Sequence, residues 1–322
     1  MTTMYGPDVT FLGIPRARLD DPTSLAGADA VIIGAPFDGG TSYRAGARFG
    51  PSAIRSADVD LLETARPHIA LGVDPLNDLR VVDAGDVMMP SGQIIESLGR
   101  LEEAVSTIVA AGAIPVVLGG DHTIALPDIS GVAKQHRAGR VAVIHFDAHT
   151  DTADFEFGSK INHATPMRRL IEAGTVRGDR FVQIGLRGYW PGPDVFDWMA
   201  EQGMRWYEMS EVGRRGIDVC LDEAFNIVRQ DCDGIFLTVD IDVVDPSMAP
   251  GTGTPEPGGL TSRQVLDAVR RCALELPILG MDMVEVAPAY DMRGEVTAYL
   301  ANRIVLETLS GIAKQRAQRT NA

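Results

Sequence analysis

The sequence predicts a single α/β domain built on a largely parallel sheet, and two observations support this. Short apolar segments rich in β-branched residues alternate with longer helix-like segments from about Ala30 to about Val286. No linker, low-complexity stretch or charge block interrupts the alternation, and 322 residues with 45% hydrophobic composition can bury a large core. We therefore expect one domain over residues 1–322, with residues 1–28 as an N-terminal extension.

Eight segments have the apolar composition of buried strands. In chain order they are Ala30–Ile33, Arg80–Asp83, Ile114–Leu118, Val141–Ile144, Phe181–Ile184, Met204–Tyr207, Ile235–Val239 and Ile278–Val284.

Helical periodicity separates several of these strands. Apolar residues recur at steps of three and four in two long segments, Ile94–Ile108 and Ala298–Ile312. Thr261 with Gln264 three residues later predicts a capping box that begins a further helix. Strand, helix and strand in succession imply right-handed crossovers and hence a parallel sheet.

Composition limits the class of partner. With 29 basic and 44 acidic residues the formal charge is −15, which disfavours nucleic acid and permits a cationic substrate. Cys220, Cys232 and Cys272 form no CxxC pair, as is usual for thiols in a reducing compartment. The N-terminus lacks the pattern of a signal peptide, and the apolar stretch Ile108–Gly120 is too short to cross a bilayer, so we expect a cytoplasmic protein without a membrane partner.

Side chains that commonly bind metals follow three of the predicted strands. They are His122, Asp147, His149, Asp151, Asp240 and Asp242. Because the carboxyl ends of parallel strands border the ligand crevice, we expect three adjacent strand ends to direct these groups into one pocket. If the chain stays extended, Asp147, His149 and Asp151 share a face.

The chemistry of this set favours two divalent cations. Four converging aspartates repel one another unless cations compensate them. A mostly oxygen set with two imidazoles suits Mn²⁺ better than Zn²⁺, with Ni²⁺, Co²⁺ or Fe²⁺ as alternatives. Two ions ~3.5–4 Å apart can share a water and lower its pKa, which predicts metal-assisted hydrolysis.

Several motifs resemble those of the ureohydrolases, the arginase and agmatinase superfamily. They are Gly119-Gly-Asp-His122-Thr, Asp147-Ala-His149-Thr-Asp151, Asp240-Ile-Asp242-Val-Val-Asp245-Pro246 and Val284-Glu285-Val286, and the similarity extends from about Ile33 to Glu307 in family order. The resemblance implies a three-layer α/β/α sandwich around an eight-stranded, mainly parallel sheet. It also implies a homo-trimer or homo-hexamer.

The resemblance implies roles for individual residues. One metal would be held by His122, Asp147, Asp151 and Asp240, and the other by Asp147, His149, Asp240 and Asp242. Hydroxide on the metals would attack the carbon of a small cationic guanidino substrate, which releases urea and an amine. Asp151 would accept a proton, His163 matches the family's proton-shuttling histidine, and Glu285 matches the carboxylate that pairs with the guanidinium.

The resemblance does not identify which guanidino compound is the substrate. Arginases carry an Asn and an Asp for the amino-acid end of arginine where this chain has Ala153 and Trp190, so arginine is disfavoured. The pattern is nearer to agmatinases and to hydrolases of ω-guanidino acids. Ala164 and Met167 depart from those relatives, and Met167 and Trp190 are candidate contacts for the substrate tail, unless they only pack locally. A reshaped pocket could admit an N-alkylated guanidine or a biguanide.

Two alternatives of other classes remain at this stage. A deacetylase-like amidohydrolase shares the implied fold but uses one zinc ion. A partner subunit without activity in a hetero-oligomer is also compatible with the family, although none of the six ligand positions is missing here.

Overall fold

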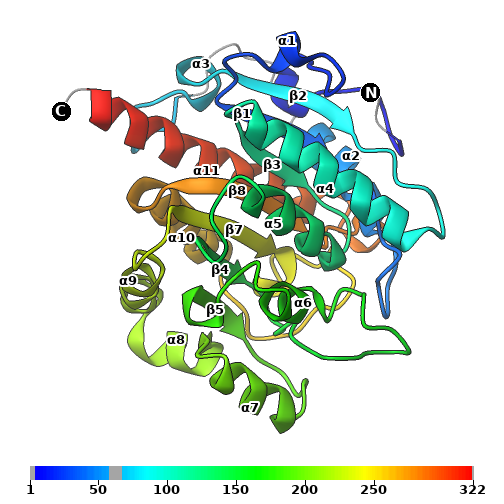
Figure 1. Ribbon diagram of the computed structural model, residues 1–322, viewed down its shortest axis with the longest axis vertical. Coiled ribbons are helices and arrows are strands. Elements are labelled where there is room, and N and C mark those ends of the chain that lie inside the picture. The colour runs from blue at the N-terminus through cyan, green and yellow to red at the C-terminus, as the bar shows by residue number, and fades with distance from the viewer. Residues whose placement is uncertain (1–3, 58–66, 321–322) are drawn as a thin grey trace.

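The computed structural model describes residues 4–57 and 67–320, which form one eight-stranded sheet with all paired strands parallel (Figure 1). The strands are β1 (Ala30–Gly34), β2 (Val81–Asp86), β3 (Ile114–Leu118), β4 (Val141–Phe146), β5 (Phe181–Leu186), β6 (Arg205–Glu208), β7 (Gly234–Asp240) and β8 (Ile278–Val284). Each overlaps one predicted strand, so the predicted fold class is confirmed.

Helices cover both faces of the sheet. They are α1 (Pro22–Leu25), α2 (Gly50–Ser56), α3 (Pro75–Asp78), α4 (Ile94–Ala110), α5 (Ala125–Ala133), α6 (Pro166–Glu172), α7 (Pro193–Glu201), α8 (Met209–Arg215), α9 (Ile217–Val228), α10 (Ser262–Glu275) and α11 (Val296–Thr320). In Figure 1 the helices α4, α5 and α6 lie in front of the sheet. The predicted capping box is present at α10, where Gln264 N–H donates to Thr261 Oγ1 over 3.2 Å and Thr261 N–H donates to Gln264 Oε1 over 2.9 Å.

Two apolar cores lie on the two faces because successive strand side chains point in opposite directions. In β1, Val31 and Ile33 belong to the core under α4 to α7, whereas Ile32 belongs to the core under α2 and α9 to α11. A sheet covered on both faces requires apolar residues at consecutive strand positions. This requirement explains the uninterrupted apolar runs in the sequence.

The N-terminal segment packs against the edge of this domain. Phe11 and Leu25 are buried, and Ala17 N–H donates to Asp83 O over 2.8 Å beside β2. The described part of the expected extension therefore contributes to the core. None of the helices in residues 4–57 and 67–320 is long and apolar enough to cross a membrane.

The strand order determines which strand ends meet. It runs β2-β1-β3-β8-β7-β4-β5-β6, so β8 separates β3 from β7. The expectation that the three ligand-bearing strands are adjacent is therefore wrong. Four neighbouring strands, β3, β8, β7 and β4, present their carboxyl ends together, and β8 brings a further carboxylate, Glu285, into the same crevice.

Candidate metal centre

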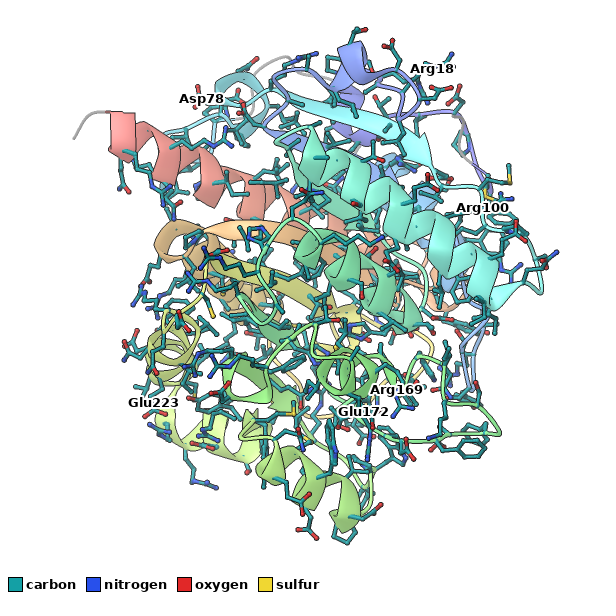
Figure 2. The ribbon with its side chains drawn as sticks, viewed as in Figure 1. Arg18, Asp78, Arg100, Arg169, Glu172 and Glu223 are labelled. Carbon is teal, nitrogen blue, oxygen red and sulfur yellow. The ribbon has the colours of Figure 1, made fainter. Side chains whose placement is uncertain are left out.

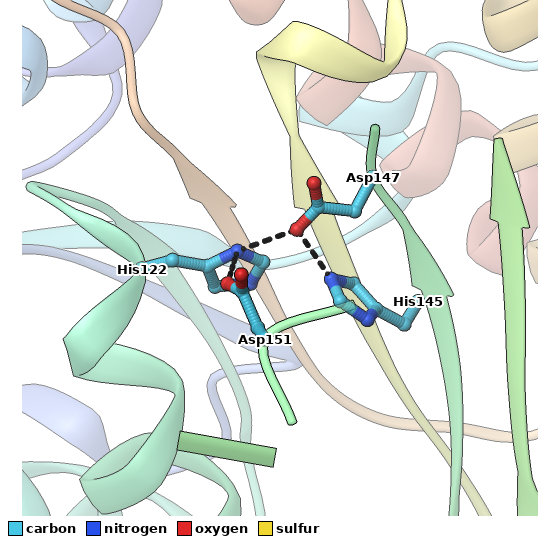
Figure 3. Close-up of side chains that lie close together, drawn as sticks. All are labelled: His122, His145, Asp147 and Asp151. Atoms are coloured by element: carbon cyan, nitrogen blue, oxygen red, sulfur yellow. Dashed lines mark hydrogen bonds and ion pairs between the residues drawn. The ribbon is translucent and has the colours of Figure 1, made fainter. Parts of the chain in front are cut away.

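His122 lies at the centre of a buried acidic cluster at the carboxyl end of the sheet. It begins the short 3₁₀ turn His122–Ile124 that follows β3. Its Nδ1 atom is 3.0 Å from Asp147 Oδ2, 3.0 Å from Asp151 Oδ2 and 3.3 Å from Asp240 Oδ2. Figure 3 shows His122, Asp147 and Asp151 directed toward one another from separate segments.

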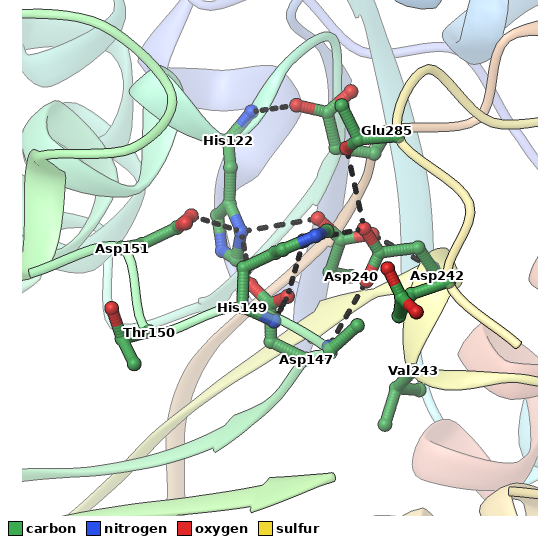
Figure 4. A network of polar contacts seen from close by, with 12 residues as sticks. His122, Asp147, His149, Thr150, Asp151, Asp240, Asp242, Val243 and Glu285 are labelled. Atoms are coloured by element: carbon green, nitrogen blue, oxygen red, sulfur yellow. Dashed lines mark hydrogen bonds and ion pairs between the residues drawn. The ribbon is translucent and has the colours of Figure 1, made fainter. Parts of the chain in front are cut away.

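His149 forms a second group beside the first. Its Nδ1 atom is 3.0 Å from Asp242 Oδ2 and 3.5 Å from Asp147 Oδ1 (Figure 4). Asp147 thus directs one carboxylate oxygen toward His122 and the other toward His149. Such a carboxylate can bridge two cations.

The residues present fit divalent cations. Ligand atoms that surround one ion at about 2.1 Å in octahedral geometry lie about 3 Å from their neighbours, and the contacts of His122 have this spacing. The Nδ1 atom of His122 is buried, and although three carboxylate oxygens lie within 3.3 Å of it, none is placed to form a hydrogen bond with it among the described residues. Burial, with the charges of Asp242 and Asp147, raises the pKa of Asp240 well above its usual range. A cation at this position would bind the His122 nitrogen and would offset the repulsion between the buried carboxylates.

His145 is part of this centre, although the sequence analysis did not identify it. Its Nε2 is 2.7 Å from Asp147 Oδ2, and the four side chains His122, His145, Asp147 and Asp151 are close enough to share one ion. Asp147, His149 and Asp242 form the second possible group, so these sets differ at His145 and Asp240 from those that the resemblance implies. The sequence spacing could have indicated His145, because it precedes Asp147 by two residues and such residues share one face of a strand.

A row of polar side chains beneath the cluster orients its histidines. Gln183, His145, Thr238 and Asp282 are register neighbours across β5, β4, β7 and β8. His145 Nδ1 is 2.8 Å from Gln183 Nε2, and His122 Nε2 is 2.8 Å from Thr238 Oγ1. Hydrogen bonds of this kind determine which ring nitrogen is free to bind a metal.

The path of the chain after β4 differs from the predicted one. β4 ends at Phe146, and Asp151 has a φ of 52°, so the expectation that Asp147, His149 and Asp151 converge along an extended strand is wrong. The loop is held by its own polar contacts, since His149 N–H donates to Asp147 Oδ1 over 2.6 Å. A non-glycine residue in the left-handed region is strained, and such residues are concentrated at functional sites.

His163 and Glu285 form a pair next to the cluster. His163 Nδ1 is 3.0 Å from Glu285 Oε1, which also accepts the His122 N–H over 2.9 Å. Burial opposes protonation of His163, but Glu285, Asp121 and Asp151 outweigh it and raise its pKa to about 9. The other oxygen of Glu285, Oε2, is buried and has no hydrogen-bond partner among the described residues.

Ser42 contacts the outer nitrogen of the same ring. His163 Nε2 lies 2.7 Å from Ser42 Oγ and 3.1 Å from Ser42 N. The hydroxyl can accept from a protonated ring, and the N–H can donate to a neutral one, so both forms find a partner. The loop that carries Ser42 must pass close to His163: a Cβ on Gly40 would lie 2.0 Å from Thr123 Oγ1 and 3.1 Å from His163 N.

A cavity of about 220 Å³ opens above these groups. His149, Asp151, His163 and Asp240 line it together with Ala164, and its remaining wall includes Glu156, Phe157 and Trp190. Of the two expected tail contacts, Trp190 therefore lies at the cavity.

Met167 does not line the cavity. Its side chain is fully buried in the core beside Leu170, because Met167 lies in the first turn of α6 and that turn packs on the sheet. Its backbone N–H donates to Asp151 O over 3.1 Å, so it contacts the site through the main chain. Tyr189 is fully exposed and is also absent from the cavity wall.

Comparisons with known proteins agree with this geometry. The family model described as Arginase family matches residues 28–311. A guanidinobutyrase from Pseudomonas aeruginosa is 38% identical over 97% of this chain and 95% of that protein. A mitochondrial agmatinase from Gallus gallus is 43% identical over 91% of this chain and 83% of that protein. The solved proclavaminate amidino hydrolase from Streptomyces clavuligerus superposes with a TM-score of 0.84 at 38% identity, over 97% and 99% of the two chains.

Proposed function

The chain belongs to the arginase family, and on that premise we propose that it is a binuclear-metal hydrolase that cleaves a small guanidino compound to urea and an amine. One observation carries this proposal. The two oxygens of the buried Asp147 carboxylate face two different imidazole nitrogens, and the His163–Glu285 pair lies beside them.

The metals would be held by the carboxylates and imidazoles around His122 and His149, while His145 holds Asp147 in place. His122, Asp151, Asp147 and Asp240 surround one position, and His149 with Asp242 and Asp147 surrounds the other. Two divalent ions bound there would supply a nucleophile near neutral pH by lowering the pKa of water. We propose Mn²⁺ as the resident metal because most ligands are oxygens, with Ni²⁺ or Co²⁺ as alternatives.

The side chains around the metals would orient the substrate and move protons. Glu285 Oε2, buried and without a partner, is suited to accept an N–H of the guanidinium. His163 retains its proton near pH 7 because its pKa is about 9, and it can give that proton to the departing amine. Asp151 can receive the proton released during attack, since it contacts the cluster and lines the cavity.

Candidate substrates are agmatine, an ω-guanidino acid, and an N-alkylated guanidine or biguanide. Arginine is disfavoured, because Ala153 is buried and apolar and Trp190 presents an aromatic ring to the cavity. Neither residue matches the charged amino-acid end of arginine.

The test is urea release by protein loaded separately with Mn²⁺, Ni²⁺ or Co²⁺. The panel contains agmatine, guanidinobutyrate, guanidinopropionate, arginine, guanidine, alkylguanidines and biguanides. Two metal ions per chain and urea from at least one compound are expected. One zinc per chain with amide deacetylation would instead favour the single-zinc alternative.

Assembly is a separate part of the proposal. We expect a homo-trimer or homo-hexamer, and light scattering on the purified chain measures it. Activity that appears only after a second type of subunit is added would indicate a hetero-oligomer.

A further inference from the structure

We propose that Glu156 makes the outer part of the cavity a subsite for a positively charged substrate tail, so that the enzyme prefers an ω-aminoalkyl guanidine such as agmatine to an ω-guanidino acid. This inference rests on the proposed guanidino hydrolase function and specifies its substrate class.

The loop that carries Glu156 is held in one conformation by short contacts. Glu156 N–H donates to Ser159 O and Ser159 N–H donates to Glu156 O, each over 3.0 Å. The two residues between them, Phe157 and Gly158, have φ values of 43° and 86°, as a type I′ hairpin turn requires. Asn162 Nδ2 also donates to Glu156 O over 2.9 Å. The position of Glu156 is therefore fixed by backbone geometry before any substrate binds.

An ion pair anchors the same loop to α6. Arg169 Nη2 is 2.7 Å from Asp154 Oδ1 and 2.9 Å from Glu172 Oε2, and Figure 2 labels Arg169 and Glu172 on that helix. The nearby cations Lys160 and Arg168 also lie within 4 Å of Asp154. Each basic group of this region thus has an acidic partner other than Glu156.

The cavity wall carries more acidic than basic side chains. Its acidic residues are Asp151, Asp240 and Glu156, and no lysine or arginine of the described chain lines it. Asp151 and Asp240 belong to the proposed metal centre, whose cations would offset them. Glu156 forms no hydrogen bond or ion pair through its carboxylate with any described residue, so its charge is available to a ligand.

Aromatic rings complete the subsite. Phe157 and Trp190 line the cavity with Glu156, and the Trp190 ring centroid lies 6.2 Å from that of His149. Such rings cover methylene groups and attract cations through their π faces. A tail carboxylate would meet a like charge and no basic partner here. A tail ammonium would meet an opposite charge and aromatic surface.

Sequence identity to known relatives does not decide between a substrate with an amine tail and one with an acid tail. The relatives described above include a guanidinobutyrase, whose name indicates an acid tail, and an agmatinase, whose name indicates an amine tail. Their identities to this chain, 38% and 43%, are too similar to choose between them. The charge of the cavity wall provides an independent criterion.

The experiment compares kcat/KM for agmatine, butylguanidine and 4-guanidinobutyrate, which differ in tail charge at similar length. We expect the wild-type protein to prefer them in that order. Glu156→Gln should lower the agmatine to guanidinobutyrate ratio by about 10-fold, and Glu156→Lys by about 100-fold, because a nearby charge is removed and then reversed. The matched control is Glu103→Lys on α4, an exposed acid away from the cavity, which should change the ratio by less than about 2-fold.

A binding measurement gives a readout without turnover. Calorimetry with 1,4-diaminobutane, the amine product of agmatine hydrolysis, should show weaker binding to Glu156→Lys than to the wild type and to Glu103→Lys. The isosteric Glu156→Gln variant keeps the comparison valid if Glu156→Lys fails to fold.

The outcomes separate this inference from the proposed function. If no guanidino compound yields urea with metal-loaded wild-type protein, the proposed function is wrong. If urea is released but agmatine is not the preferred compound of the three, or the Glu156 variants keep the wild-type ratio, only the tail subsite is wrong.

Discussion

Two buried clusters of aspartates differ in where their compensating positive charge comes from. At the β1–β2 edge, the fully buried Arg55 donates from Nε to Asp83 Oδ2 over 2.8 Å and from Nη1 to Asp86 Oδ1 over 2.5 Å. Asp83 also accepts the Phe11 N–H over 2.9 Å. The folded chain itself provides the positive charge and the hydrogen-bond donors for these two carboxylates.

The candidate metal centre lacks an internal cation of this kind. Its aspartates face imidazoles and one another, and no lysine or arginine side chain of the described residues forms an ion pair with Asp147, Asp151, Asp240 or Asp242. The contrast indicates that the edge cluster is structural and that the central cluster is open to ions from solution.

Asp147→Ala should abolish the central cluster's function and destabilise the fold less than the loss of Arg55 does. It removes the two oxygens that face His122 and His149, so we expect urea release to fall by about 1,000-fold or more and bound metal to decrease. In metal-free buffer the free energy of unfolding should fall by about 1–3 kcal/mol, because the His149 N–H and the His145 ring lose their acceptor on Asp147. Metal analysis, urea assay and chemical denaturation measure these effects, and full activity in the variant would contradict the assignment.

Arg55→Met should have the opposite profile. It leaves Asp83 and Asp86 buried without a cation, so we expect a loss of about 3–5 kcal/mol in unfolding free energy. The folded fraction should still bind metal. Denaturant titration measures the change, and a loss below about 1 kcal/mol would show that the edge cluster tolerates uncompensated charge.

His163→Gln tests the proton-carrying group beside the metal centre. We expect a decrease of about 100-fold in kcat with metal content unchanged, because His163 is a proton carrier and does not belong to either ligand group. In the wild type, the ring is protonated below its pKa of about 9, so activity that depends on this proton should decline as pH rises through that value. The same sign applies to stability: the contribution is fully present below about 6.5 and is lost as pH rises through about 9. A kcat/KM profile that shows no decline above pH 9 would exclude His163 as the acid.

His145→Asn should have the smallest effect on the centre. The side chain holds Asp147 from beneath, so its loss should weaken metal affinity by about 10- to 100-fold and leave the folded state intact. Metal titration measures the affinity. The His145→Gln variant, which is longer and can still donate to Asp147, should recover part of it.

Local patterns along the chain were sufficient to predict the strands and most of the chemistry. Each strand is marked by consecutive apolar residues, because a sheet buried on both faces admits no polar alternation. The identities of His122, Asp147 and Asp240 are equally local, since each lies at or just after the end of a recognisable strand. His163 and Glu285 depended on the family resemblance, because a single histidine or glutamate carries no spacing of its own.

The three-dimensional packing was needed to show which groups face one another. Strand order placed β8 between β3 and β7, and the left-handed backbone of Asp151 replaced the expected extended path. Packing also buries Met167 in the core, and the path of its loop places Glu156 at the cavity. Residue spacing specifies the face of one strand or helix, whereas neighbours across a sheet and the paths of loops depend on packing between segments far apart in the chain.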